Sequence, residues 1–89
     1  MKFTLLTPAQ QMAATEATYV SIAGEAGDFG VLPGHMPLVS TLRPGGLVSV
    51  THTNGDVESF TVSAGVAEVT PQSVTILAES AAVAVPAAA

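Results

Sequence analysis

The chain has 89 residues, with two Lys or Arg residues, seven Asp or Glu residues and no cysteine. This length suits one compact domain with a modest core. Two cations cannot neutralise a row of phosphates, so the charge balance excludes a nucleic-acid partner and attraction to anionic lipid. The absence of cysteine excludes thiolate chemistry and cysteine-based zinc sites. No apolar run approaches the roughly 18 residues of a membrane span, so we expect no direct lipid insertion.

The surface is predicted to be polar but almost uncharged. Only 10% of the residues are charged, whereas ordinary soluble domains have about 25%. Serine and threonine are expected to fill the outward positions instead. Burying a hydroxyl costs much less than burying an ion, so such a surface favours a protein interface. Compositional drift is the equally weighted alternative.

The first part of the chain predicts two strands. Lys2 to Thr7 is expected to be a strand ended by Pro8, and Ala9 to Ala14 could hold one helical turn. Glu16 to Ala23 is rich in β-branched residues and predicts a second strand. One face of this strand is expected to carry Thr18, Val20 and Ile22, and the other Tyr19 and Ser21.

The next segment combines glycines with carboxylates. Gly24 to Gly30 is predicted to be an acidic, glycine-punctuated loop, followed by the apolar pair Val31–Leu32 and the turn Pro33-Gly34. Pro37 to Leu42 predicts a strand, which the turn residues at positions 43–46 close.

Apolar and polar residues alternate with a period of two through most of the remaining sequence. Leu47 to His52 predicts a strand with its valines facing inward. The link Thr53-Asn54-Gly55-Asp56 predicts a two-residue type I′ hairpin turn, because Asn-Gly readily adopts positive φ at both central positions. Further strands are expected around Phe60, over Val66 to Thr70 and over Ser73 to Ala78.

Turn signals recur about every ten residues, as expected of an all-β sandwich or barrel. We therefore predict a single domain over residues 1–80 and an Ala-rich tail over residues 81–89 that is frayed or disordered. The N-terminus resembles neither a signal peptide nor a transit sequence, so we expect the chain to begin at its natural start. The ending, interrupted by Pro86, favours a natural terminus or a linker over a domain cut.

The chain lacks the residue patterns of catalysis. His35 and His52 are far apart in sequence, and no carboxylate-rich spacing supplies further metal ligands. No Gly-x-Ser-x-Gly elbow or Walker loop is present. The only lysine, Lys2, is not at a hairpin tip, where a biotin or lipoate carrier needs one. We therefore expect no catalytic residue, no metal site and no cofactor.

The run Gly-Asp-Phe-Gly-Val-Leu-Pro-Gly-His-Met-Pro-Leu, residues 27–38, is the most distinctive segment. Its glycines and Pro-Gly pair make it tightly turned, and on its own it indicates a well-built turn between strands. The run resembles the signature of the epsilon subunit of F-type ATP synthase. The resemblance continues through residues 41–45, 63–69 and 74–79, and at Thr7-Pro8 and Gln10-Gln11-Met12, and covers residues 2–82 in the family's order.

This resemblance implies a flattened β-sandwich of about ten short strands at the foot of the central stalk. One face would pack on the gamma subunit, and the glycine-rich end would rest on polar loops of the membrane c-ring. The chain would be a non-catalytic subunit of a proton- or ion-translocating synthase, peripheral to the cytoplasmic face of the bacterial inner membrane, and would couple ion-driven rotation to ATP synthesis. By residue match, the docking loop comprises Glu25, Asp28, Gly30, Pro33, Gly34, His35 and Met36.

The end of the chain departs from the family pattern. Family members usually continue into a C-terminal helical hairpin that can restrain ATP hydrolysis and in some members binds ATP. This sequence stops at Ala89 without a helical pattern, so inhibition and nucleotide binding are not expected of it. The alternative from another functional class is a small β-sandwich that binds a small molecule or a metal through the His35 loop.

Overall fold

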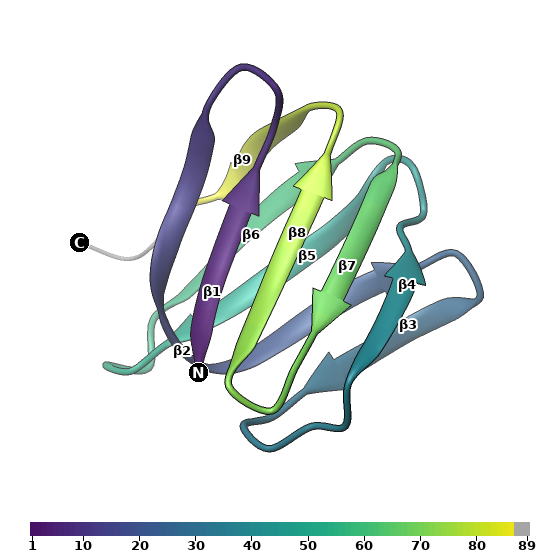
Figure 1. Ribbon diagram of the computed structural model, residues 1–89. Helices are drawn as coiled ribbons and strands as arrows, with labels where there is room; N and C mark the ends of the chain where they lie inside the picture. Colours follow the sequence, from purple (N-terminus) through teal and green to yellow (C-terminus); the bar gives the residue numbers. More distant parts are fainter. Residues whose placement is uncertain (87–89) are drawn as a thin grey trace.

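A computed structural model describes residues 1–86, which form nine β-strands (Figure 1). The strands are β1 (Lys2–Leu6), β2 (Gln11–Gly24), β3 (Gly27–Val31), β4 (Leu38–Thr41), β5 (Gly46–His52), β6 (Val57–Val62), β7 (Gly65–Val69), β8 (Ser73–Ala78) and β9 (Ala81–Val85). The predicted all-β sandwich is confirmed. Among these residues no helix is long and apolar enough to cross a membrane.

Two hydrogen-bonded layers share the long strand β2 (Figure 1). The front sheet has the order β4-β7-β8-β1 and ends on the first half of β2, with β1 and β8 parallel and the other pairs antiparallel. The back sheet pairs the second half of β2 with both β3 and β5, and continues through β6 to β9. The described chain is flattened, with principal extents of 30 × 29 × 21 Å.

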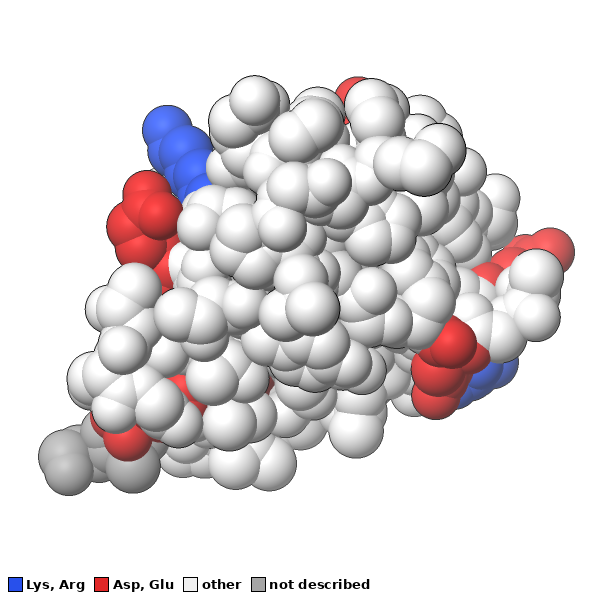
Figure 2. All heavy atoms as spheres, turned by 90° about the horizontal axis from the view of Figure 1, so that it is seen from below, with Lys and Arg blue, Asp and Glu red and all other residues white. Residues whose placement is uncertain are grey.

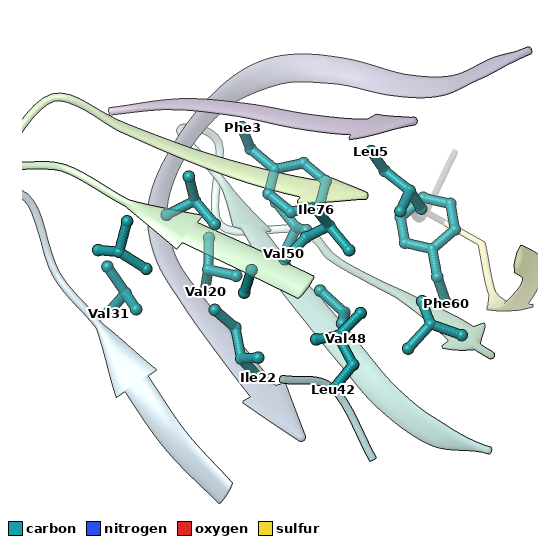
Figure 3. Packing of buried hydrophobic residues seen from close by; sticks show 14 of the residues in the cluster. Phe3, Leu5, Val20, Ile22, Val31, Leu42, Val48, Val50, Phe60 and Ile76 are labelled. Atoms are coloured by element: carbon teal, nitrogen blue, oxygen red, sulfur yellow. The ribbon is translucent and has the colours of Figure 1, made fainter. Parts of the chain in front are cut away.

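The core lies between the two layers and is almost entirely aliphatic (Figure 3). Phe3 on β1 and Phe60 on β6 face each other across it, with ring centroids 6.5 Å apart. Alternate residues of each strand point into it, which is the period-two pattern that the sequence shows. Its largest fully buried side chains are Phe3, Phe60, Leu5, Ile22, Leu42, Ile76, Val20, Val31, Val48, Val50, Val62 and Val74.

Two expectations for the ends of the sheets are corrected. The helical turn expected over residues 9–14 is wrong, because β2 already begins at Gln11 and pairs with β1. The frayed tail expected after residue 80 is replaced over Ala81–Val85 by β9, which pairs with β6. Ala81 packs against the core, so the strand has a tertiary contact that the composition of the tail did not reveal. Residues 87–89 of the expected tail lie outside the described residues.

A β-bulge in β2 corrects the predicted facing of Thr18. The pairing of β2 with β5 shifts register between Ala17 and Tyr19, so that Thr18 has no directly opposed partner. Ala17 and Val20 are buried, whereas Thr18 and Tyr19 between them are both exposed. A bulge inserts one residue and thereby reverses the alternation beyond it, which a strict period-two count cannot anticipate.

The β5–β6 link is a tight turn, as predicted, but it is not type I′. The Gly55 N–H donates to the His52 carbonyl at 2.9 Å, and the His52 N–H donates to the Asp56 carbonyl at 2.8 Å. Gly55 has a φ of 92°, whereas no non-glycine residue of the described chain has positive φ. The link is therefore a three-residue loop, a type I turn followed by a left-handed glycine. The Asn54 side chain accepts a hydrogen bond from the Asp56 N–H at 3.0 Å, and the backbone φ of Asn54 is not positive.

This turn type makes Thr53→Pro and Gly55→Ala change stability in opposite directions. Thr53 occupies the position of a type I turn that favours proline, so Thr53→Pro should raise the free energy of unfolding by about 0.5–1 kcal/mol. A Cβ at Gly55 would meet nothing within 4 Å, so Gly55→Ala should lower it by about 1–2 kcal/mol through backbone strain alone. Denaturant unfolding of both variants checks this. In a type I′ turn the Thr53 N–H would belong to the ladder, so a strongly destabilised Thr53→Pro variant would contradict the assignment.

Candidate functional site

The residues expected to form one docking loop lie along the edge strand β3 and its two flanking turns, here called the β3 edge (Figure 1). Asp28 and Gly30 are strand residues and not loop residues, because β3 pairs in register with β2 from Gly24↔Gly27 to Val20↔Val31. Glu25 lies in the β2–β3 turn at one end of β3, and Pro33 to Met36 lie in the turn at the other. The expected loop is therefore two turns separated by a strand of five residues, about 17 Å long.

The turn from Leu32 to Pro37 is rigid and carries exposed apolar side chains. The His35 N–H donates to the Leu32 carbonyl at 3.1 Å, and Gly34 between them has a φ of 87°. Pro33 followed by such a glycine is the pattern of a type II turn. The Gly34 N–H also donates to the Pro71 carbonyl at 2.9 Å, which fastens this turn to the β7–β8 turn.

Two apolar residues of this turn point to solvent. Met36 is 77% exposed and Leu32 is 60% exposed. The His35 ring is held at the surface, with Nδ1 2.7 Å from the Met36 carbonyl oxygen. The turn thus presents an apolar tip on a fixed backbone, an arrangement suited to contact with another surface.

The other end of the β3 edge is a corner at which the two layers are joined. The Arg43 Nη1 lies 2.7 Å from the Asp28 Oδ1 and also donates to the Gly24 carbonyl at 3.3 Å. The Arg43 backbone N–H donates to the Ala23 carbonyl at 2.9 Å, and the Glu25 N–H donates to the Thr41 carbonyl at 2.8 Å. The link between β4 and β5 therefore holds the β2–β3 hairpin through both backbone and side chain.

Gly30 is required by the close approach of Tyr19. The Tyr19 ring crosses the face of β3 at this position, and a Cβ on Gly30 would overlap the Tyr19 hydroxyl and ring edge. A glycine at this point leaves room over the strand for the ring of Tyr19, the only tyrosine of the chain. The sequence places Gly30 in the docking segment but gives no sign that Tyr19 covers it.

The outer face of the front sheet carries a feature that the sequence reading missed. Leu6, Leu77 and Val66 are cross-strand neighbours on this face. Leu6 and Leu77 also line a shallow hollow of ≈ 420 Å³ between the ends of β1 and β8 and the start of β7, with Pro8 and Glu79 at its margin. The sequence did contain a sign of this feature. Positions 6 and 77 face outward in the alternating pattern, where a polar residue is expected, but both are leucines.

The outer face of the back sheet matches the predicted hydroxyl-rich surface. Ser21, Ser49 and Ser59 lie opposite one another on three neighbouring strands. The Ser49 and Ser59 hydroxyl oxygens are 2.8 Å apart and hydrogen-bonded. Ser59 is the only buried polar residue of the described chain, and its hydroxyl is satisfied in this way.

Charged side chains are few on the end of the molecule seen in Figure 2. Acidic and basic atoms lie at its margins, and the broad middle of the view carries neither. The net charge of −5 is thus spread around the molecule and not concentrated there. An uncharged end is inexpensive to desolvate against a partner.

The two histidines occupy separate environments. His52 Nε2 lies 3.3 Å from Glu58 Oε1, and its Nδ1 lies 3.2 Å from the Thr15 hydroxyl. Within residues 1–86, no three His, Cys, Asp or Glu side chains come together in a group that could hold a metal ion. Four hollows of this surface are lined by other residues, and His35 borders none of the four.

Comparison with known proteins gives consistent matches. Residues 1–84 match the family model described as the ATP synthase delta/epsilon chain, β-sandwich domain. The chain is 44% identical over 77 residues to an ATP synthase epsilon chain of Xylella fastidiosa, covering 86% of this chain and 54% of the relative. It is 47% identical over 68 residues to an ATP synthase epsilon chain of Bordetella petrii, covering 76% of this chain and 48% of the relative. The chain thus spans about half the length of these curated relatives.

Solved structures show the same fold. A chain of the Euglena gracilis mitochondrial ATP synthase, in a structure of OSCP, F1 and c-ring, aligns with a TM-score of 0.83 at 28% identity, covering 91% of this chain and 51% of that chain. A chain from the central stalk and c-ring structure of Tetrahymena thermophila mitochondrial ATP synthase aligns with a TM-score of 0.74 at 15% identity, covering 92% and 65%. The second likeness concerns the fold alone.

The contact between Gly30 and Tyr19 predicts that Gly30→Ala displaces the tyrosine ring. The obstructing atoms are at the far end of a side chain that can rotate, so stability should fall by less than about 1 kcal/mol while Tyr19 becomes more exposed. The chain has one tyrosine and no tryptophan, so intrinsic fluorescence quenched by iodide or acrylamide reports on this ring directly. Gly27→Ala is the control on the same strand: its Cβ meets nothing within 4 Å, so its cost is backbone strain at a φ of 139° and the quenching of Tyr19 should not change. Equal quenching in Gly30→Ala and the unsubstituted chain would show that Tyr19 does not cover Gly30.

Proposed function

The chain belongs to the ATP synthase delta/epsilon chain family as its β-sandwich domain, and we propose that it is a non-catalytic subunit of the central stalk that docks the gamma subunit onto the c-ring. The observation that carries this proposal is the family match over residues 1–84, with relatives named as epsilon chains at 44% and 47% identity. In this role the domain would help to couple ion-driven rotation to ATP synthesis. It would lie at the cytoplasmic face of a bacterial inner membrane as a peripheral subunit.

We assign the gamma-facing surface to the outer face of the front sheet. The hollow beside Leu6 and Leu77 has almost entirely apolar walls and can receive an apolar side chain of a partner. Val39 on the edge strand β4 extends this surface and is 71% exposed. At the β6–β9 end of the back sheet a hollow of ≈ 400 Å³ is lined by hydroxyl-bearing residues and small apolar ones (Thr61, Ser63, Ser80, Ala81 and Ala82) and by no leucine, so we rank it below the front hollow as an anchored contact.

We assign the ring-facing surface to the β3 edge, above all to the Leu32–Pro37 turn. Its exposed side chains Leu32 and Met36 sit on a backbone that is already bonded to the β7–β8 turn. A contact made by such a turn loses little conformational entropy on docking. The turn leads directly into β4 of the front sheet, so the two proposed contact surfaces adjoin. One rigid domain could therefore hold both partners together.

The first test is capture of partners by the folded chain. The tag belongs after Ala89, because the Met1 amino group donates to the Ala17 carbonyl at 2.9 Å and should stay free. From detergent-solubilised membranes of the source organism, we expect the gamma subunit and the c-ring to be recovered together and identified by mass spectrometry. If the circular dichroism spectrum shows that the tagged chain is folded and it still recovers neither subunit, the proposal is contradicted.

Met36→Asp should weaken capture of the c-ring by about tenfold or more while the gamma subunit is retained. Burying a side chain of this size contributes about 1.5–3 kcal/mol, and a charge at the centre of a contact removes that contribution. Val85→Asp is the matched control, because Val85 is exposed on β9 at the opposite edge of the back sheet. Equal losses in the two variants would assign the ring contact elsewhere.

Leu77→Glu should instead weaken capture of the gamma subunit by about tenfold, since it places a charge in the front hollow. Leu47→Glu on the outer face of the back sheet is the control, with the same chemical change at a similarly exposed position, 49% against 38%. If Leu47→Glu weakens capture of the gamma subunit and Leu77→Glu does not, the gamma-facing surface lies on the back sheet and our assignment is wrong. Both variants must first show unchanged unfolding transitions.

A further inference from the structure

The β5–β6 turn contains the only asparagine of the chain, Asn54, and the next residue is Gly55. Both residues are exposed, and the turn lies on the opposite side of the view in Figure 1 from β3 and β4. We propose that Asn54 is a site of spontaneous deamidation, with the chain's own backbone as nucleophile and water as the only co-reactant, and that the hydrogen bonds of the turn set its rate. This inference does not depend on the proposed function.

The reaction joins the backbone of Gly55 to the side chain of Asn54. The Gly55 nitrogen loses its proton to water and attacks Cγ of Asn54, so that a bond between this nitrogen and Cγ forms. The bond between Cγ and Nδ2 breaks, and Nδ2 takes a proton from water and leaves as ammonia. Water then opens the resulting five-membered succinimide at one of its two carbonyls, which gives aspartate or isoaspartate. A glycine favours the attack because it has no Cβ to crowd its nitrogen.

The folded turn holds both reacting groups in other interactions. The Gly55 N–H donates to the His52 carbonyl at 2.9 Å, so its proton is already engaged. The Asn54 Oδ1 accepts a hydrogen bond from the Asp56 N–H at 3.0 Å, and Nδ2 donates to Asp56 Oδ2 at 3.1 Å. The attack therefore requires the turn to open, and exposed turns open at a low free energy. The fraction of time for which the turn is open then sets the rate of deamidation.

Isoaspartate, which forms when the ring opens at its backbone carbonyl, changes the backbone of the turn. The chain then continues through the side-chain carbon and gains one methylene group. The Gly55 N–H donates to the His52 carbonyl and the His52 N–H to the Asp56 carbonyl, and a longer backbone between these groups disturbs both bonds. Either product also places a carboxylate beside that of Asp56, where a neutral amide now donates.

The rate experiment follows the mass of the intact chain at physiological temperature and neutral pH. We expect the chain unfolded in guanidinium chloride to deamidate about tenfold faster than the folded chain, because its turn is always open. Asn54→Gln is the control, since it keeps an amide but would react only through a less favourable six-membered ring. It should gain no mass on the same timescale, and an equal gain in this variant would overturn the assignment of the site.

Thr53→Pro tests the restraint without changing either reacting residue. If it stiffens the turn as predicted above, it should lower the ratio of folded to unfolded deamidation rates by about two- to fivefold. An unchanged ratio in a variant whose unfolding midpoint has risen would show that turn opening does not limit the reaction. If the midpoint does not rise, the folded and unfolded rates of the unsubstituted chain decide alone, and equal rates overturn the restraint.

The consequence for stability is measured on the separated products. Each carries one more negative charge and is resolved by anion exchange, and labelling by an isoaspartyl methyltransferase identifies the isoaspartate form. Its folded-to-unfolded ratio should fall by about tenfold. Asn54→Asp has the same charge on a normal backbone and can still accept from the Asp56 N–H, so its ratio should fall by about threefold or less. Equal stability of the two would overturn the claim that the added backbone carbon disrupts the turn.

Discussion

The structure depends on a single strand that belongs to both layers. β2 runs for 14 residues, pairs with β1 in the front sheet through its first half, and pairs with β3 and β5 in the back sheet through its second. A straight strand cannot serve two facing sheets, and the bulge at Thr18 lies where β2 leaves one sheet for the other. Bulges increase local twist and bend. The closure of a core around Phe3 and Phe60 therefore follows from one inserted residue.

A domain of this size has little apolar area to bury, and the distribution of polar groups reflects that limit. The core is aliphatic, and no buried side-chain nitrogen or oxygen of the described residues lacks a hydrogen-bond partner. Charges are scarce, so the exposed faces consist of hydroxyl groups and of apolar side chains such as Leu77 and Met36. Such faces are inexpensive to desolvate, which suits a subunit whose proposed work is contact and not chemistry.

The sequence predicted the fold class because alternation and turn residues are local signals. It gave β1, β5 and β8 to within a residue or two, and it located the Asn54-Gly55 turn. It failed in two places: β9 is ordered through its tertiary pairing with β6, and Asn54 keeps a negative φ while its side chain bonds the Asp56 N–H. The β6 partner of β9 lies outside any local window, whereas the Asn54 bond is local and was missed because Asn-Gly suits more than one turn type.

The candidate site was predictable only as a set of residues. The motif at positions 27–38 suggested one acidic loop, whereas the structure has a strand between two fastened turns. That difference bears on mechanism. A flexible loop would lose conformational entropy on docking and would yield under torque, whereas the Gly34 N–H is bonded to the Pro71 carbonyl and the Glu25 N–H to the Thr41 carbonyl before any partner arrives. Fastening both ends of β3 to the rest of the sandwich makes the edge a rigid extension of the core, as the proposed transmission of rotation requires.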